Sequence, residues 1–353
     1  MKKIRMGVIG LGSISRNHIE GIRRSPDAEL IAVCDLKSDV LKTKGEALGI
    51  SEDHRFGSYS DLLMCEDVDA VSICTQNDAH LEITLNAIKQ KKPFILEKPV
   101  TLNYNQALTL KKLANENNIK NMIAFSYRYK PAVRFARWII KQGHLGRIYH
   151  INVSYLQGWG ISDQMPLVWR FKKDKSGSGA LGDLGSHMID LTRFLVGDFE
   201  EVCSQAGTFI KERKNIITGE NEDVDVDDYC NFMALLERDV AAVFAITRNA
   251  YGRGNYQRIE VYGSKGGLVY NLDNEDSIQV CIGDVYNSSK EYKQIRVPDE
   301  YKADQMQSFF DIINGKADGL SADIDDGYRN QYILDKIIES FDKKSWVSLR
   351  ENV

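Results

Sequence analysis

The sequence predicts an α/β protein of two domains: a doubly wound parallel sheet first, then an α+β domain with a largely antiparallel, open-faced sheet. Two observations predict this division. Apolar strand-like runs alternate with helical patterns through the first third of the 353 residues, and the later extended runs follow one another across short turns. We place the two domains at 1–125 and 126–353.

The first strand and helix are joined by a glycine-rich turn. A strand over 4–9 leads into this turn at 10–15, and a second apolar run over 30–34 ends in Asp35. Gly10 permits a tight turn, Gly12 lets backbone N–H groups approach a pyrophosphate, and Asp35 can accept hydrogen bonds from a ribose diol. The pattern predicts a dinucleotide-binding Rossmann domain, with a turn that binds nothing as the alternative. The candidate cofactor contacts of the turn are Gly10, Gly12, Ser13 and Ile14.

The choice of dinucleotide depends on Asp35, whose charge would repel a 2′-phosphate. Lys37 lies two residues further and offers a cation to that phosphate. Ser15 stands at the third glycine position and packs slightly less closely than glycine. The sequence therefore favours NAD as the cofactor and leaves NADP as the alternative.

Composition excludes several classes of protein. The net charge is −4 with both signs mixed, so we expect no nucleic acid and no membrane as partner. No apolar stretch approaches the ~20 residues of a membrane span. The cysteines include no C-x-x-C pair, which indicates a reducing, cytoplasmic location and no metal or disulfide role. They are Cys34, Cys65, Cys74, Cys203, Cys230 and Cys281.

The first domain continues as alternating strands and helices. Apolar runs predict strands at 69–75, 94–96 and 121–125, and helical patterns lie at 40–48, 79–88 and 106–114. Ligands of parallel sheets bind beyond the carboxyl ends of the strands. The residues that fall there are Thr75, Gln76, Asn77, Glu97, Lys98 and Pro99.

The second domain has a different order of extended and helical segments. Extended runs lie at 147–157, 202–210, 228–236, 240–248, 258–262 and 267–270, and helical patterns at 184–195, 303–313 and 327–341. Antiparallel sheets often leave one face without helices. We expect a second copy of the chain to cover that face, in a homodimer or homotetramer.

Two segments carry candidate catalytic groups. Lys98 follows a strand end, where a shielded ammonium can polarise a substrate oxygen; the alternative is a solvated lysine before a turn proline. In the glycine-rich segment 177–190, Asp183, His187 and Asp190 fall on one helix face. Catalytic acid–base work, a structural histidine and a metal site are the three interpretations of this trio.

With these motifs, Gly10-Leu11-Gly12, Glu97-Lys98-Pro99 and Asp183-x-Gly185-x-His187, the whole chain resembles the glucose-fructose oxidoreductase/inositol dehydrogenase/MocA family. The resemblance implies that Lys98, Asp183 and His187 are the catalytic set around the substrate carbinol carbon. It also implies that residues after the third strand lie at the nicotinamide, namely Thr75, Asn77 and His80. These motifs are specific for the family and say little about the substrate.

Candidate substrate-binding residues come from three places. Tyr127 and Arg128 follow a strand end, and a guanidinium presents fixed donors to hydroxyls or a phosphate. Trp169 and Arg170, like Trp159, precede the candidate catalytic helix, and for each tryptophan core packing is an equal alternative. Asp183 and His187 complete the set. His18 is expected to be structural or exposed.

Three functions fit these observations. The first is an NAD(P)-dependent oxidoreductase that transfers a hydride between nicotinamide and a secondary alcohol or ketone of a sugar, sugar derivative or inositol. The second is an enzyme of the same family that retains NAD and cleaves a glycosidic bond. The third is a non-catalytic regulator that binds NAD or sugar.

Overall fold

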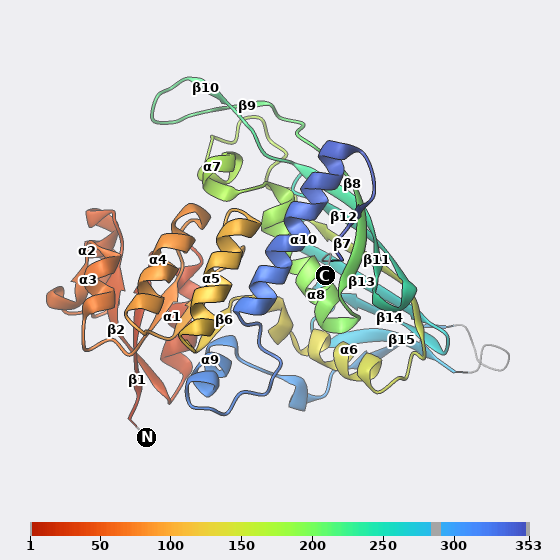
Figure 1. The fold of residues 1–353 in the computed structure, drawn as a ribbon, viewed down its shortest axis with the longest axis horizontal. Coiled ribbons are helices and arrows are strands. Elements are labelled where there is room, and N and C mark those ends of the chain that lie inside the picture. Colours follow the sequence, from red (N-terminus) through yellow and green to blue (C-terminus); the bar gives the residue numbers. More distant parts are fainter. Residues whose placement is uncertain (1, 284–290, 351–353) are drawn as a thin grey trace. The chain divides into compact units, whose positions relative to one another are not determined.

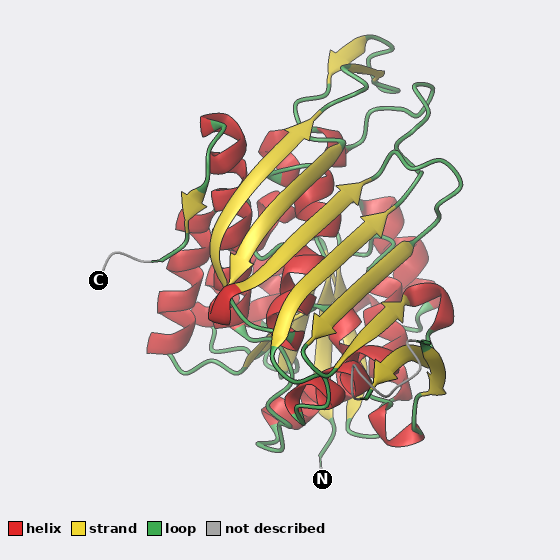
Figure 2. Ribbon diagram, turned by 90° about the vertical axis from the view of Figure 1, so that its right-hand side faces the viewer, coloured by secondary structure: helices red, strands yellow, loops and turns green. Residues whose placement is uncertain are grey.

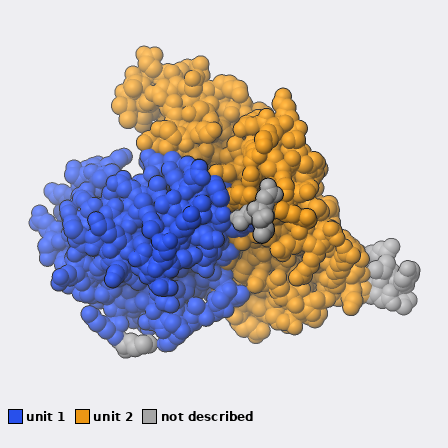
Figure 3. Space-filling model, viewed as in Figure 1, with its two compact units in different colours: residues 1–126, 303–331 blue, residues 127–302, 332–353 orange. Residues whose placement is uncertain are grey.

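The computed structural model describes residues 2–283 and 291–350, which divide into two compact units (Figure 3). Unit 1 comprises Met1–Ser126 and Ala303–Gln331, and unit 2 comprises Tyr127–Lys302 and Tyr332–Val353. The first boundary is adjacent to the predicted one. The segment 303–331 differs from the prediction, because it packs with unit 1 rather than with the second domain.

Unit 1 contains a six-stranded sheet in the order β3-β2-β1-β4-β5-β6, and every adjacent pair is parallel. This is the strand order of doubly wound dinucleotide-binding domains. The strands are β1 (Ile4–Ile9), β2 (Ala28–Cys34), β3 (Arg55–Phe56), β4 (Ala70–Ile73), β5 (Phe94–Leu96) and β6 (Asn121–Ile123). The helices are α1 (Ser15–Arg24), α2 (Ser38–Ala47), α3 (Tyr59–Met64), α4 (Asn77–Lys89), α5 (Tyr104–Glu116) and α9 (Gln305–Ile313), with the start of α10 (Ile324–Lys343) (Figure 1).

Three local contacts explain why 303–331 belongs to unit 1. Gly21 of α1 lies against α9, where an added Cβ would be 2.4 Å from the Met306 side chain. Arg24 donates to Asp304, the N-cap residue of α9, at 2.6 Å. Further along, Ile123 N–H donates to the carbonyl of Ala322 at 2.8 Å beside β6. A helical pattern alone carries no signal of such long-range partners.

Unit 2 contains a nine-stranded sheet in the order β16-β15-β14-β13-β7-β12-β11-β8-β17 (Figure 2). Its pairs are antiparallel except β7 with β12, so the predicted fold class is confirmed. The strands are β7 (Ile148–Leu156), β8 (Phe199–Gly207), β11 (Tyr229–Leu236), β12 (Val240–Thr247), β13 (Tyr256–Gly263), β14 (Gly266–Asn271), β15 (Ser277–Ile282), β16 (Lys293–Arg296) and β17 (Val347–Ser348).

The remaining elements of unit 2 are a separate hairpin and several helices. They are β9 (Glu212–Lys214), β10 (Asn221–Asp223), α6 (Pro131–Lys141), α7 (Lys173–Ser176), α8 (Ser186–Leu195) and the rest of α10. Just before α8, residues Leu181–Gly185 form a π-helical turn. Such turns inside α-helices are frequent at functional sites.

Successive side chains in the nine-stranded sheet alternate between a buried face and an accessible face. Along β11 and β12 every second residue is buried, as the period of a strand requires. Met233 and Val243 belong to the other face and are 47% and 43% exposed.

Unit 2 encloses a bidentate ion pair between Arg128 and Asp190. Arg128 Nε donates to Asp190 Oδ2 at 2.9 Å and Nη2 donates to Oδ1 at 2.6 Å. The side chains are 5% and 1% exposed. Such a pair contributes little more to the free energy of unfolding than a pair of apolar side chains would. Loss of one partner, however, leaves the other as an unpaired buried charge, which is destabilising.

Replacement of Asp190 by alanine should therefore lower the free energy of unfolding by about 3–5 kcal/mol, measured by urea denaturation. Lys343→Ala removes the exposed pair with Glu339 and serves as the control, with an expected loss below ~1 kcal/mol. Equal losses in the two variants would contradict the prediction.

Candidate active site

The glycine turn of unit 1 has an open backbone. Gly10 has a φ of +87°, and a Cβ there would lie 2.8 Å from the carbonyl oxygen of Cys74, so only glycine fits. A Cβ at Gly12 would meet nothing within 4 Å. Ile14 caps α1 without a side-chain hydrogen bond, and the first turn of α1 has no acidic residue. The N–H groups at this helix start therefore suit an anion such as a pyrophosphate.

Asp35 orders the same turn from the end of β2. Its Oδ2 accepts the N–H of Leu11 at 2.9 Å, and its Oδ1 accepts the N–H of Lys37 at 2.9 Å. A carboxylate has about four acceptor sites, so two remain for a ribose diol. The residues present in unit 1 thus fit a dinucleotide.

The turn after β4 is tied to the turn after β5 by His80. This ring is 0% exposed, with Nδ1 2.9 Å from the carbonyl oxygen of Pro99 and Nε2 3.3 Å from that of Thr75. Burial lowers the pKa of His80, so the ring is neutral near pH 7 and donates to only one of these two carbonyls. His80 was predicted to touch the cofactor, whereas both of its nitrogens contact the backbone. Asn77, at the start of α4, is 8% exposed.

The turn that carries Lys98 is anchored by a buried ion pair. Glu97 Oε1 lies 2.9 Å from His18 Nε2, and Glu97 Oε2 accepts the N–H of Lys98 at 3.2 Å. His18 Nδ1 lies 2.7 Å from Ser72 Oγ. Burial alone would lower the pKa of His18, but Cys74 and Glu97 outweigh burial and raise it to about 10. Burial likewise would raise the pKa of Glu97, but the hydrogen bond and charge of His18 outweigh burial and lower it.

His18 and Glu97 are therefore both charged near pH 7, and this ion pair connects α1 to the turn before Lys98. His18 was expected to be structural or exposed, and its pairing with Glu97 was not predicted. The only sequence signal was the position of His18 on the apolar face of α1.

The candidate catalytic side chains of unit 2 lie on one helical segment. Asp183 belongs to the π-helical turn, and His187, 8% exposed, belongs to the first turn of α8. The Tyr127 ring meets the His187 ring edge-on, with centroids 4.6 Å apart. Arg170 Nε lies 3.8 Å from Asp183 Oδ2, and its guanidinium stacks 4.5 Å from the centroid of the Trp169 ring. Unit 2 thus brings together most of the predicted substrate residues.

A hydrogen-bonded cluster of hydroxyl and amide groups extends from Tyr127. Its hydroxyl lies 2.8 Å from that of Tyr155, which donates to Asn255 Oδ1 at 2.7 Å. Gln157 Nε2 donates to the same oxygen at 2.8 Å, and Trp159 Nε1 donates to Gln157 Oε1 at 2.7 Å. Burial raises the pKa of Tyr155, so its hydroxyl stays protonated.

Sequence analysis missed three members of this cluster, Tyr155, Gln157 and Asn255. The first two lie at the carboxyl end of β7, and Asn255 directly precedes β13. No motif contains them. Their position at strand ends was the only signal.

Arg128 was predicted to hold substrate hydroxyls. The structure instead buries it, 4% exposed, with its guanidinium on Asp190. Nε and Nη2 are thereby matched to a carboxylate, and substrate binding by Arg128 stays a prediction. Asp190, which was predicted to share a helix face with Asp183 and His187, is the partner in this pair.

Among the described residues, one group of histidine, cysteine and acidic side chains could hold a metal ion, namely His54, Cys65 and Asp67, with ligand atoms within 4.8 Å of one another. Asp67 already pairs with Arg5 at 2.8 Å. No helix in the described part of the chain is both long and apolar enough to cross a membrane.

Comparison with known proteins connects this geometry to a family. Residues 4–125 match the oxidoreductase family with an NAD-binding Rossmann fold, and residues 133–269 match the GFO/IDH/MocA C-terminal domain. Levoglucosan dehydrogenase from Pseudarthrobacter phenanthrenivorans is 31% identical over 99% of each chain. Inositol 2-dehydrogenase from Rhizobium meliloti is 25% identical over 98% of this chain and 99% of its own.

Solved structures agree with the sequence relatives. A levoglucosan dehydrogenase in complex with NADH and L-sorbose superposes with a TM-score of 0.91 at 29% identity, over 99% of this chain and 100% of that one. The predicted family, fold and NAD-binding domain are therefore confirmed. The chain belongs to the GFO/IDH/MocA family of oxidoreductases, with an NAD-binding Rossmann domain at its N-terminus.

Proposed function

We propose that this protein is an NAD-dependent dehydrogenase that oxidises a secondary alcohol of a sugar, sugar derivative or cyclitol, and reduces the ketone in reverse. The observation that carries the proposal is the neighbourhood of His187. A histidine beside tyrosine hydroxyls and side-chain amides combines a proton acceptor with groups that bind polyols. The names of the relatives, levoglucosan and inositol dehydrogenases, support the same substrate class.

Bound NAD supplies the acceptor for the hydride that leaves the carbinol carbon. We assign His187 as the base that takes the hydroxyl proton, and Lys98 as the cation that stabilises the developing alkoxide. Asp183 orients His187 or a substrate hydroxyl. In the reverse direction His187 returns the proton to the ketone oxygen.

Separate groups hold the cofactor and the substrate. We assign the pyrophosphate to the backbone of Gly10, Gly12, Ser13 and Ile14, and the ribose to Asp35. Thr75, Asn77, Glu97 and Lys98 form the candidate nicotinamide side, and His80 contacts the backbone of Thr75 and Pro99 there. The candidate substrate contacts are Tyr127, Tyr155, Gln157, Trp159, Trp169, Arg170 and Asn255.

A glycoside-cleaving enzyme that retains NAD, and a non-catalytic regulator, predict different observations. The first would recycle NAD while it releases an aglycone. The second would bind NAD and show no turnover. A screen of cyclitols, aldoses, sugar phosphates and nucleotide sugars, monitored by NADH absorbance with each coenzyme, identifies the dehydrogenase. Release of an aglycone at constant NADH absorbance identifies the glycoside-cleaving enzyme, and binding of NAD without either signal identifies the regulator.

Removal of either proposed acid–base group should slow the chemical step. We expect Lys98→Ala and His187→Ala each to lower kcat by about 10²–10⁴-fold, while the Kd for NADH, measured by fluorescence titration, changes little in His187→Ala. Undiminished turnover in both variants would overturn the catalytic assignment.

Asp35 should set the coenzyme preference. Hydrogen bonds to a charged group contribute about 1.5–3 kcal/mol, so Asp35→Ser should lower the ratio of kcat/KM for NAD to that for NADP by about 10–10²-fold. Asp39→Ser, in the first turn of α2, is the matched control and should leave this ratio unchanged. A ratio that stays constant in Asp35→Ser would contradict the assignment.

We also propose that a second copy of the chain covers the accessible face of the nine-stranded sheet, in a homodimer or homotetramer. Met233→Lys on β11 should then convert the assembly to smaller species in light-scattering chromatography. Met64→Lys changes a methionine of similar exposure on α3 and should not. A specific contact should bury more than ~1,000 Å². A wild-type monomer at micromolar concentration would refute this part of the proposal.

The six cysteines are free thiols in the structure. We propose a reducing, cytoplasmic location on this basis, since free thiols persist in that compartment.

A further inference from the structure

The helical segment that carries the two candidate catalytic groups of unit 2 is capped by a residue from a distant loop. Asp227 Oδ1 accepts the N–H of Gly179 at 2.7 Å, and Asp227 Oδ2 accepts the N–H of Leu181 at 2.7 Å. The backbone carbonyl of Asp227 accepts the N–H of Ala180 at 2.9 Å. N–H groups at a helix start have no acceptor within their own helix. Three consecutive ones are satisfied here by a single residue.

The two backbones are also in direct contact. A Cβ at Gly179 would lie 1.8 Å from the carbonyl oxygen of Asp227 and 2.8 Å from its nitrogen. Backbone atoms cannot move aside as a flexible side chain can. Position 179 therefore requires glycine, and the start of the helix has one fixed distance from Asp227.

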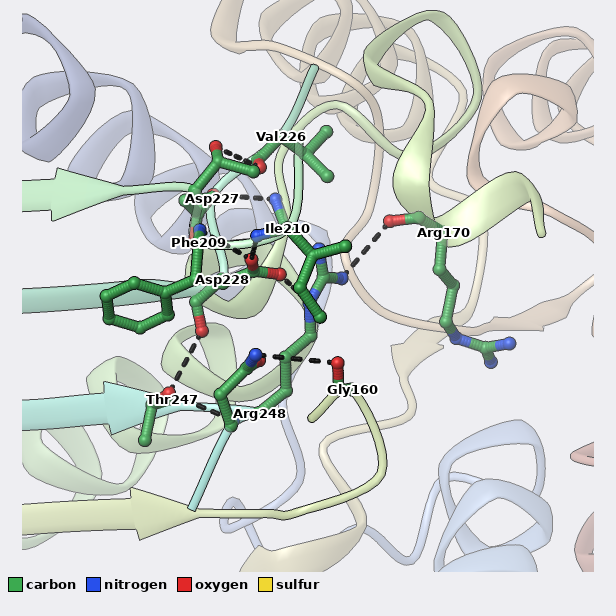
Figure 4. A network of polar contacts seen from close by, with 12 residues as sticks. Gly160, Arg170, Phe209, Ile210, Val226, Asp227, Asp228, Thr247 and Arg248 are labelled. Atoms are coloured by element: carbon green, nitrogen blue, oxygen red, sulfur yellow. Dashed lines mark hydrogen bonds and ion pairs between the residues drawn. The ribbon is translucent and has the colours of Figure 1, made fainter. Parts of the chain in front are cut away.

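Asp227 is itself held by its neighbour in the chain. Asp228 and Arg248 form an ion pair at 3.2 Å in which both side chains are 0% exposed (Figure 4). Asp228 Oδ2 also accepts the N–H groups of Phe209 at 2.8 Å and Ile210 at 3.1 Å. This ion pair immobilises the loop just before β11.

The same network reaches the segment that precedes the helix. Arg248 Nη1 donates to the carbonyl of Arg170 at 3.2 Å (Figure 4). The Arg248 guanidinium lies 4.6 Å from the centroid of the Phe171 ring and 5.3 Å from that of Trp159. The cap, the loop and the segment around Arg170 thus form one continuous set of contacts.

The charge of Asp227 depends on the groups that it caps. Burial raises the pKa of Asp227, and the N–H groups of Leu181 and Gly179 oppose that rise. A carboxylate at a helix start is further stabilised by the helix dipole. The cap and the helix start therefore support each other.

We propose that Asp227 is a positioning residue, which fixes the start of the helix and thereby sets where Asp183 and His187 stand. The consequence for turnover rests on the proposed function, because a displaced side chain slows turnover only if it acts in the reaction. A misplacement of ~1 Å can cost about 10²-fold in rate.

The test compares Asp227→Asn with Asp225→Asn. The first substitution keeps the shape of the side chain but turns an NH2 group toward one of the two N–H donors. Asp225 is a matched control from the same loop, since its Oδ1 accepts the N–H of Lys173 at 2.7 Å at the start of α7, which bears no candidate catalytic group. We expect D227N to lower kcat about 10–10²-fold with little change in KM or NADH affinity, and D225N to match wild type.

A spectroscopic readout makes the test independent of turnover. The edge-on Tyr127 ring, 4.6 Å from the His187 ring, gives the His187 proton signals a ring-current shift that depends on distance. We expect D227N to move these NMR signals, identified by their loss in H187Q, and D225N to leave them in place.

The outcomes are distinct. Wild-type kcat together with an unmoved His187 signal in D227N would overturn the inference, even where the dehydrogenase activity is confirmed. Absence of turnover in wild type would refute the proposed function, and the NMR comparison would still decide the role of Asp227. If D227N lacks native near-UV circular dichroism, Thr208→Val replaces it. That variant removes only the hydroxyl that donates to the Val226 carbonyl at 2.7 Å, and should give a smaller effect in the same direction.

Discussion

The buried pair of His18 and Glu97 is the interaction on which unit 1 depends for its chemistry. His18 lies on the helix whose start faces the dinucleotide turn, and Glu97 directly precedes Lys98. Two charged groups at 3% and 8% exposure are costly to bury unless each is paired and hydrogen-bonded. Here Ser72 and the Lys98 N–H complete the hydrogen bonds. The pair therefore makes the cofactor turn and the lysine turn parts of one rigid element.

Unit 2 follows the same principle with different residues. The pair of Arg128 and Asp190 ties the segment after Tyr127 to the middle of α8, and the pair of Asp228 and Arg248 stands behind the Asp227 cap at its start. The helix with His187 is thus held at two points by buried carboxylates. Such pairs add little net stability, yet they penalise every arrangement that would separate them. Their effect is to limit how far the His187 ring can move from Tyr127.

The elements that the sequence predicted are those whose signal is local. The glycine turn, the strand at 94–96 and the hairpin of β11 and β12 follow from adjacent residues, and the structure contains them. The features that were not predicted depend on distant partners. Arg128 has the chemistry of a ligand fork, but a carboxylate on another helix occupies it. The packing of 303–331 on α1 joins two segments that are far apart in the chain, and so does the cap that Asp227 supplies. In neither case does the sequence of one segment indicate the other.

The same distinction explains why the motifs indicate the reaction and not the substrate. Asp183 follows a position where a backbone contact demands glycine, Gly179 against Asp227, and Lys98 follows Glu97, which a buried ion pair with His18 holds in place. The polar cluster around Tyr155 imposes no such demand. Gln157 and Asn255 meet through side-chain hydrogen bonds alone, so another amide or hydroxyl could replace either without a change in the backbone. Sequence motifs record such buried contacts, whereas the proposed substrate contacts are visible only once the strand ends are placed in space.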